Sequence, residues 1–400
     1  MRIVIVQYAG DYREAAGRID ATGQETYYAQ KYSVDAVAQL AHCCESVAVI
    51  CGLTETAYDE LLDNGVHAIG AGFSAPFDER ALIDLVAREK PDRLIVRMPA
   101  MHLLKWAISQ PFRTIAVLAD SFSSKGIRGY IHSRRWAKLL NDKRIEWIFN
   151  HGLNSCISLR NIGVSADKTI PWDWPALVTP AAEVKSLQSL ASYEALYAGM
   201  VTEAKGIGDV LQAVARLKFT KTRVTLKVVG SGDIPAFTAL AKKLQIEDCV
   251  RFQGLLPHEK VLEEMRQADL VVVPSRHEYS EGFPMTIYEA LCARTPVVAS
   301  DHPMFRANLT HEVDALIFSA GNVPALAAAI ERLLSDSGLY RSLSVASAQT
   351  WNQLQLPVKW AEALERWIGD SPADREWLFD HRLSSGIYPL YRYEKLSRVP

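Results

Sequence analysis

Two glutamates carry the most informative pattern in the 400-residue chain. Glu281 and Glu289 have seven residues between them and follow an apolar run at 269–274 that is typical of a strand. Pro284, between them, suits the first turn of a helix, where a missing backbone N–H matters little. Helical side chains lean toward the N-terminus, so Glu289 would point to the region of the loop residue Glu281. Carboxylates placed there can accept hydrogen bonds from hydroxyl groups, as acidic residues do with ribose in nucleotide-binding folds.

The start of the same predicted helix is suited to an anion. Amides near its first residues would point out of the helix N-terminus, where free N–H groups and the helix dipole favour phosphate. A phosphate, a ribose and a further hydroxyl-bearing group could then be held within one turn and its loop. The alternative is that both glutamates are solvated surface residues, which their spacing around Gly-Phe-Pro after a strand disfavours. The residues that this geometry predicts to bind a ligand are Met285, Thr286 and Glu289.

The elements that must position these residues alternate between short apolar runs and longer amphipathic stretches. Strands are predicted at 2–7, 46–52, 92–97, 113–119 and 145–149, with helices at 25–42, 78–89 and 126–140 among them. Further strands are predicted at 194–200, 223–230, 249–253, 269–274, 296–300 and 315–318. This alternation predicts parallel sheets covered by helices on both faces, an α/β fold.

The pattern weakens at 171–192, where Pro, Ala, Ser and charged residues mix. We therefore predict two doubly wound Rossmann-like domains, 1–180 and 181–355, since 400 residues exceed what one core usually holds. Residues 356–400 are predicted to form a C-terminal helix and a tail that packs back on the body. Ligands of such sheets gather at the carboxyl ends of the strands, so paired domains would share a cleft.

Composition indicates a soluble enzyme of the cytoplasm. Apolar residues make up 49% of the chain, and a net charge of −2 gives no overall attraction to nucleic acid. The six cysteines form no CxxC pair and are typical of buried thiols in a reducing compartment. The N-terminus lacks the pattern of a signal peptide, and no apolar run is long enough to span a bilayer.

The stretch around the two glutamates resembles glycosyltransferase family 4, retaining enzymes of the GT-B fold. The match is SEGFPMTIYEAL followed by PVVAS, and then by HEVDALIF and a PALAAAI helix. The resemblance covers roughly 195–350 well and the N-terminal half loosely. It implies that Glu281 contacts the donor sugar beside the reacting carbon and that Glu289 binds the ribose. The resemblance also implies that the backbone between them, at Gly282, Phe283, Pro284, Met285 and Thr286, holds the diphosphate and the sugar hydroxyls.

Two more segments of the C-terminal half fit this resemblance. In AGMVTEAKGIGDVLQAV, Lys205 and Gly206 open a helix, where a lysine adds charge to a site that attracts phosphate. A surface lysine is the alternative, and Met200 stands where the family usually has an arginine. In KVVGSGDIPAF, the turn at Gly230 and Ser231 follows a strand and is expected near the nucleotide, although Gly-x-Gly alone is a weak signal.

The N-terminal half offers two candidates. Gly23 lies just before the helix predicted at 25–42 and corresponds loosely to a Gly-Gly loop of the family near the donor phosphate. Asp120 ends the strand TIAVLAD, where Ala119 replaces the family histidine. Asp120 either positions the acceptor or accepts its proton, or it caps the turn that follows.

Together these residues predict a retaining glycosyltransferase that moves a sugar from a nucleotide diphosphate sugar to an acceptor hydroxyl, in polysaccharide or glycolipid assembly. The predicted catalytic residues are Glu281, Lys205 and Asp120. A UDP-sugar is expected more than a GDP-sugar, and neither a cofactor nor a metal is expected. The alternatives are a nucleotide-sugar epimerase of the same fold and a non-catalytic nucleotide-sugar-binding subunit, which Met200 and Ala119 keep open.

A basic segment at 125–144 stands apart from these motifs. Seven Lys or Arg residues face one Asp, with Trp136, Leu139 and Leu140 among them. Such a helix can lie on an anionic membrane or meet a lipid-linked acceptor at the inner face of the membrane. A solvated helix face is the alternative, and nucleic acid is disfavoured because no recognition motif accompanies the patch.

Overall fold

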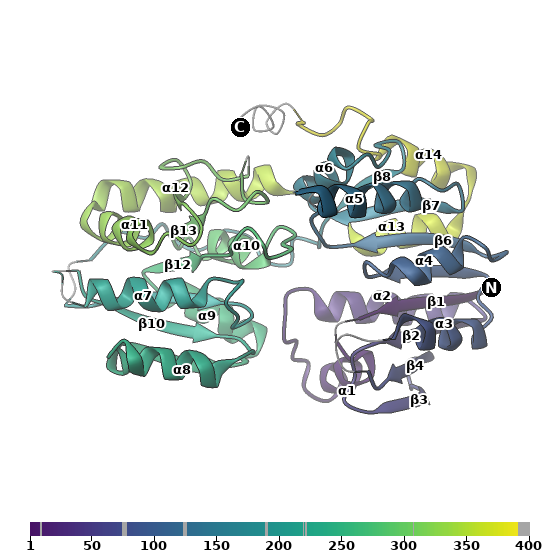
Figure 1. The fold of residues 1–400 in the computed structure, drawn as a ribbon, viewed down its shortest axis with the longest axis horizontal. Helices are drawn as coiled ribbons and strands as arrows, with labels where there is room; N and C mark the ends of the chain where they lie inside the picture. Colours follow the sequence, from purple (N-terminus) through teal and green to yellow (C-terminus); the bar gives the residue numbers. More distant parts are fainter. Residues whose placement is uncertain are drawn as a thin grey trace. The chain divides into compact units, whose positions relative to one another are not determined.

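The chain folds into two compact units in a computed structural model that describes residues 1–8, 10–73, 78–122, 126–188, 191–218, 220, 222–306 and 308–390 (Figure 1). Unit 1 contains Met1–Glu25, Ala29–Pro175 and Leu356–Pro389. Unit 2 consists mainly of Ala176–Gln355 and also includes Thr26–Tyr28. Unit 1 is therefore built from chain segments that precede and follow Ala176–Gln355 in the sequence.

Unit 1 holds a sheet in which every described neighbouring pair is parallel except β3 and β4. The strand order is β3-β4-β2-β1-β5-β6-β7-β8. The strands are β1 (Arg2–Gln7), β2 (Ser46–Cys51), β3 (Ala57–Leu61), β4 (Val66–Ala71), β5 (Arg93–Arg97), β6 (Arg113–Leu118), β7 (Ile145–His151) and β8 (Thr169–Trp172). The helices are α1 (Tyr12–Thr22), α2 (Gln30–Cys43), α3 (Glu79–Arg88), α4 (Met101–Ala107), α5 (Gly126–Leu140), α6 (Leu153–Asn161), α13 (Trp360–Gly369) and α14 (Pro372–Asp380).

Both faces of the unit 1 sheet are buried, which explains its continuous apolar strands. Ile3 and Ile5 of β1 pack into one core with α1, α2 and α13, whereas Val4 and Val6 pack into another with α3, α4, α5 and α6. Successive side chains of a strand point to opposite faces, so one apolar run serves both cores.

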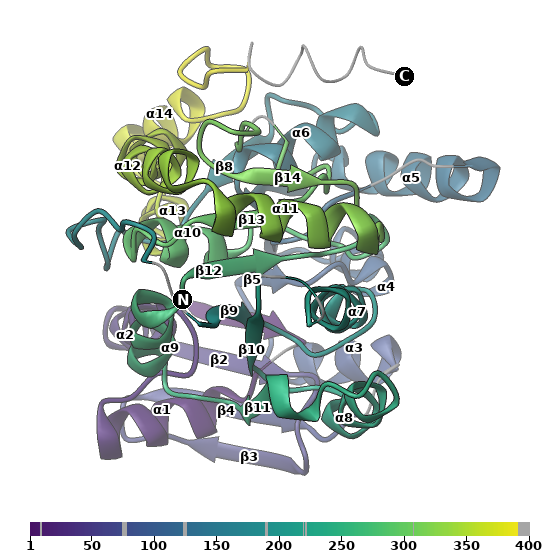
Figure 2. The same cartoon turned by 90° about the vertical axis from the view of Figure 1, so that its left-hand side faces the viewer.

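Unit 2 repeats this design with a parallel sheet in the order β11-β10-β9-β12-β13-β14. The strands are β9 (Tyr193–Ala198), β10 (Val224–Val229), β11 (Val250–Gly254), β12 (Leu270–Val273), β13 (Val297–Ser300) and β14 (Leu316–Phe318). The helices are α7 (Ile207–Leu217), α8 (Ile234–Lys243), α9 (His258–Gln267), α10 (Met285–Cys292), α11 (Val323–Ser335) and α12 (Ser337–Leu354). Figure 2 shows α9 and α10 on one side of the strands and α7 and α8 on the other, so both faces of this sheet are covered by helices.

The predicted α/β fold with Rossmann-like sheets is confirmed. The differences from the prediction are individual strands and helices that the sequence did not predict. The sequence did not predict β3, whose residues Ala57–Leu61 are largely exposed, or its buried neighbour β4. It placed the start of a linker at 171, inside β8, because Pro171 interrupts the apolar pattern of that strand. Nor did it predict α1, α4 or α6. Among the described residues, no helix is long and apolar enough to cross a bilayer.

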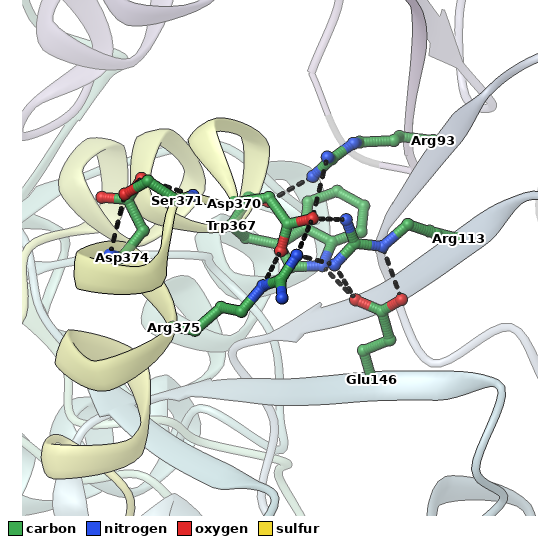
Figure 3. Close-up of polar contacts among 8 residues, drawn as sticks. All are labelled: Arg93, Arg113, Glu146, Trp367, Asp370, Ser371, Asp374 and Arg375. Atoms are coloured by element: carbon green, nitrogen blue, oxygen red, sulfur yellow. Dashed lines mark hydrogen bonds and ion pairs between the residues drawn. The ribbon is translucent and has the colours of Figure 1, made fainter.

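The C-terminal segment of unit 1 is attached through a polar cluster at the amino-terminal edge of the sheet (Figure 3). Asp370, which ends α13, accepts hydrogen bonds from Arg113 at 2.5 Å and from Arg375 at 2.9 Å. Arg113, at the start of β6, also pairs with Glu146 at 2.6 Å, and Trp367 donates its indole N–H to the same carboxylate at 2.8 Å. Hydrogen bonds from Arg375 and then Arg113 lower the pKa of Asp370. The cluster therefore fixes α13 and α14 to the sheet, at the edge opposite to the strand ends that bind ligands in such folds.

Candidate functional site

A buried ion pair occupies the carboxyl edge of the unit 2 sheet, in the loop between β12 and α10. Lys205 Nζ lies 2.5 Å from Glu281 Oε1, and Ser275 donates its hydroxyl to the same oxygen at 2.6 Å. The Glu281 side chain is 6% exposed and the Lys205 side chain 15%. Both contacts use Oε1, so within the described part of the chain Oε2 of Glu281 has no partner. The ring of Tyr279 lies beneath the ammonium, 4.5 Å from Nζ to the ring centroid.

Gly206 explains how Lys205 reaches this position. It precedes α7 with a φ of 78°, and a Cβ at this residue would lie 2.3 Å from the carbonyl oxygen of Pro274. A positive φ and a close backbone approach both favour glycine. The loop that carries Lys205 can therefore pack directly against the end of β12, from which Ser275 and Glu281 follow.

The predicted turn at Gly230 and Ser231 packs against the same loop. A Cβ on Gly230, whose φ is 138°, would lie 1.8 Å from the carbonyl oxygen of Gly199. The Ser231 carbonyl accepts a hydrogen bond from the Val201 amide at 2.8 Å. The turns after β9 and β10 are thus held together by backbone contacts, which places Gly230 and Ser231 beside the segment that leads to Lys205.

Helix α10 begins at Met285, so Pro284, which the sequence analysis expects in the first turn, is instead the residue that precedes the helix. Thr286 donates its hydroxyl to the Ala198 carbonyl at 3.1 Å, which ties the first turn to the end of β9. Amides of a first helical turn have no partner inside the helix, so this end can bind an anion. The Phe283 side chain is buried against Tyr288, with ring centroids 5.2 Å apart. Phe283 and Gly282 can therefore contact a ligand chiefly through the backbone.

Glu289, one turn into α10, is paired with a histidine that the sequence analysis missed. His258 Nε2 lies 2.7 Å from Glu289 Oε1, and both residues are 6% exposed. His258 is the first residue of α9. The ring of Tyr28, which belongs to unit 2, lies edge-on to it at 5.5 Å. The imidazole orients the Glu289 carboxylate. Because Glu289 is buried and paired, it is not the solvated surface residue of the alternative interpretation.

Met200 stands at the position where the resemblance leads us to expect an arginine. Met200 is 51% exposed. Arg276 follows β12 in the same loop region, but its guanidinium pairs with Asp209 at 2.7 Å and Glu203 at 2.6 Å, and these partners raise its pKa. The charge of Arg276 is therefore already compensated by these two carboxylates. The cation that contacts Glu281 is Lys205.

Gly23 in unit 1 lies elsewhere than the sequence predicts. It ends α1 with a φ of 70°, and its amide donates to the Ile19 carbonyl at 2.7 Å. The next helix, α2, begins only at Gln30. The expectation of a glycine directly before a helix is therefore wrong, because the polar sequence of α1 concealed a helix that this glycine terminates.

Asp120 follows β6 at the carboxyl edge of the unit 1 sheet, as expected. Burial raises the pKa of its carboxyl, and a backbone hydrogen bond from Ala119 opposes the rise. Its carbonyl accepts a hydrogen bond from the Asn150 side chain at 3.0 Å. Burial and then the charge of Asp120 raise the pKa of Tyr8, which follows β1. The suggested turn extends into residues 123–125, which lie outside the described residues.

A second histidine–carboxylate pair at this edge was also missed. His151 ends β7, and its Nε2 lies 3.2 Å from Asp173 Oδ1, just beyond β8. Both side chains are buried, and the His151 ring packs on Trp172 at 4.8 Å. Because Leu118 pairs with Asn150, Ala119 and His151 are the next residues on adjacent strands. The imidazole of His151 therefore lies on the strand next to Ala119, the residue that replaces the histidine expected from the resemblance.

The candidate site residues of unit 2 fall within a segment, residues 181–350, that matches the family described as glycosyl transferases group 1. The chain is 33% identical over 138 residues to the amylovoran biosynthesis glycosyltransferase AmsK of Erwinia amylovora. This match covers 33% of the chain and 34% of that protein. The chain spans about a third to a half of the length of the first curated relatives that it matches.

Solved structures show the fold over nearly the whole chain. Sucrose-phosphate synthase from Thermosynechococcus elongatus has a TM-score of 0.67 at 18% identity, with 94% of this chain and 99% of that chain covered. HepE from Anabaena in complex with UDP-glucose has a TM-score of 0.60 at 14% identity, with both chains fully covered. The two Rossmann-like units are therefore those of the GT-B fold, and residues 181–350 are the part of the chain that is similar to group 1 glycosyl transferases.

Proposed function

We propose that the chain is a retaining glycosyltransferase that moves a sugar from a UDP-sugar to an acceptor hydroxyl. The observation that carries this proposal is the buried Glu281, held by Lys205 and Ser275 beside the N-terminus of α10. Support comes from the family match over 181–350 and from HepE, whose structure was determined with UDP-glucose. Polysaccharide or glycolipid assembly is the proposed setting, as the name of the Erwinia relative suggests.

Each residue of the site has a distinct task in this proposal. The bond between the anomeric carbon and the diphosphate oxygen breaks, and a bond to the acceptor oxygen forms on the same face of the sugar. Lys205 and the first amides of α10 stabilise the charge on the departing diphosphate. An ammonium has three N–H donors, so Lys205 can keep its bond to Glu281 while it donates to phosphate.

Glu281 and Glu289 would act on opposite parts of the donor. Oε2 of Glu281 is available to a hydroxyl of the transferred sugar, while Oε1 stays with Lys205 and Ser275. Glu289, oriented by His258, would accept hydrogen bonds from the ribose hydroxyls. We propose that the site needs no metal ion, because Lys205 and the helix amides supply the positive charge.

Asp120 is our proposed acceptor-side residue in unit 1. A carboxyl whose pKa is raised by burial is better matched to proton transfer near neutral pH than an ordinary aspartate. The proton released by the acceptor hydroxyl would pass to this carboxylate or to the departing diphosphate.

Replacement of each glutamate by glutamine tests the site. Glu289→Gln should raise KM roughly 10- to 100-fold for a UDP-sugar, because a hydrogen bond to a charged group is lost in ground and transition states alike. Glu281→Gln should instead lower kcat by roughly 100-fold, because that carboxylate lies beside the reacting sugar. Glu247→Gln, an exposed change in the same unit, is the matched control. Full activity of both site variants would refute the assignment.

The two rival functions separate in simple assays. Incubation with the UDP-sugar alone should give at most slow hydrolysis, whereas recovery of an epimerised donor would identify an isomerase. Met200, in place of a second cation, is the observation that favours a non-catalytic binding subunit. Sugar transfer to a crude acceptor extract would exclude that function, and UDP binding without any transfer would support it.

A further inference from the structure

Helix α5 carries four cationic side chains and no acidic one. Arg128, Arg134, Arg135 and Lys138 are all exposed, and across the described residues none of them forms an ion pair with a carboxylate. Elsewhere in unit 1, arginines such as Arg113 are bound by carboxylates. The charge on α5 is therefore uncompensated.

The same face of α5 exposes large apolar side chains. Ile127 is 81% exposed, Tyr130 57% and Ile131 48%. At 3.6 residues per turn these residues share an arc with Arg134 and Lys138. A helix that needed only a solvated face would not place two isoleucines there.

The opposite face of α5 explains why the helix stays in place. Trp136, Leu139 and Leu140 are buried in a core of unit 1, and Trp136 packs against Phe122 at 5.8 Å. The outward arc is therefore not held by contacts within the unit, and Figure 2 shows α5 along the outside of unit 1.

A hollow of about 560 Å³ lies beside the outward arc. Its lining includes Tyr130, Ile131, Arg134, Lys138 and Asn141. Arg135 lines it as well, so three cations surround a space that can admit a phosphate group, beside the exposed apolar side chains of Tyr130 and Ile131.

We propose that the outward face of α5 docks on an anionic lipid bilayer. Ile127, Tyr130 and Ile131 enter the headgroup region, while the arginines and Lys138 contact lipid phosphates. Charge complementarity selects this partner, and the exposed isoleucines distinguish it from nucleic acid, which offers no apolar layer. The proposal uses only unit 1 residues and does not depend on the donor site. Lys125, part of the basic segment in the sequence, lies outside the described residues.

Vesicle flotation of the full-length protein tests this proposal. We expect binding to phosphatidylglycerol–phosphatidylcholine vesicles, little binding to phosphatidylcholine alone, and weaker binding at high salt because surface charges are screened. Arg134→Gln/Arg135→Gln should weaken binding about fivefold for each charge removed. Lys242→Gln/Lys243→Gln, which removes two exposed charges from α8, should leave binding unchanged.

The apolar contribution needs its own variant. Ile127→Ser/Ile131→Ser keeps every charge, and because both side chains are exposed it should keep the melting temperature of the wild type. It should nevertheless reduce binding to the anionic vesicles. Equal flotation of this variant, or equal binding to neutral and anionic vesicles, would overturn the proposal. Binding of an RNA oligonucleotide without vesicle binding would overturn it as well and would assign the face to nucleic acid.

Discussion

Replacement of Lys205 by methionine should destabilise unit 2 and weaken nucleotide binding together. Methionine keeps an unbranched side chain but leaves Glu281, 6% exposed, with Ser275 as its remaining partner. Loss of one partner from a buried ion pair costs about 3–5 kcal/mol. The 15% exposure of Lys205 and the retained serine hydrogen bond place the expected loss near the lower end, about 3 kcal/mol.

A double-mutant cycle separates the ion pair from other effects of the substitution. Lys205→Met/Glu281→Gln removes the uncompensated charge and should be more stable than Lys205→Met alone, with a coupling energy of about 1–3 kcal/mol. Urea unfolding followed by circular dichroism measures this coupling for the four proteins. Additive losses would show that the two side chains do not interact in solution.

Nucleotide affinity gives the second half of the same test. Lys205 is the cation paired with Glu281, and its ammonium keeps further N–H donors for phosphate, so its loss should weaken UDP binding roughly 10- to 100-fold, as expected for a hydrogen bond to a charged group. Titration calorimetry with UDP measures this change, and uridine, which lacks phosphate, should bind both proteins equally. An unchanged affinity for UDP would refute the assignment of Lys205 to the diphosphate.

Three further substitutions test other parts of the structure. Gly206→Ala should destabilise the protein by about 2 kcal/mol or more, since the residue has a positive φ and its Cβ would meet Pro274, and thermal unfolding checks this. Asp120→Asn should lower turnover while leaving UDP affinity unchanged. Burial raises the pKa of Asp120, so the ionised carboxylate opposes folding. The variant should therefore gain stability relative to the wild type as pH rises through the folded pKa of Asp120. Full turnover would leave Asp120 as a turn residue. Asp370→Asn should cost about 1–2 kcal/mol at neutral pH. The lowered pKa of Asp370 makes its contribution present above the unfolded value, so the deficit should vanish in acid as pH falls through the folded pKa, and denaturant titrations at several pH values measure this.

The core strands and the α10 site were predictable because their signals are local. β1 and β12 are continuous apolar runs, which is what burial on both faces requires. The start of α10 follows from Pro284 alone, and the spacing of the two glutamates places them on one loop and one helical turn. Predictions of this kind need only the chemistry of neighbouring residues.

The histidine–carboxylate pairs were not predictable in this way. His258 meets Glu289 from 31 positions away, and His151 meets Asp173 from 22. Nothing near either histidine marks a partner, and the strand that leads to Asp173 is disguised by Pro171. Such contacts depend on strand order, which only the folded chain reveals. Similarly, the polar sequence of α1 gave no reason to expect the helix that Gly23 ends.

The return of Leu356–Pro389 to unit 1 has a consequence for synthesis on the ribosome. Trp360 and Trp367 complete a core whose first strand is made from residues 2–7, yet they are translated after all of Ala176–Gln355. Unit 2 is nearly contiguous and can fold as soon as it emerges. Unit 1 must instead wait, with Arg113 and Glu146 lacking Asp370 and Trp367, and with apolar surface uncovered. The nascent chain is therefore most exposed to chaperones and proteases in unit 1 until its last helices leave the exit tunnel, and a stop codon shortly after residue 355 should affect unit 1 far more than unit 2.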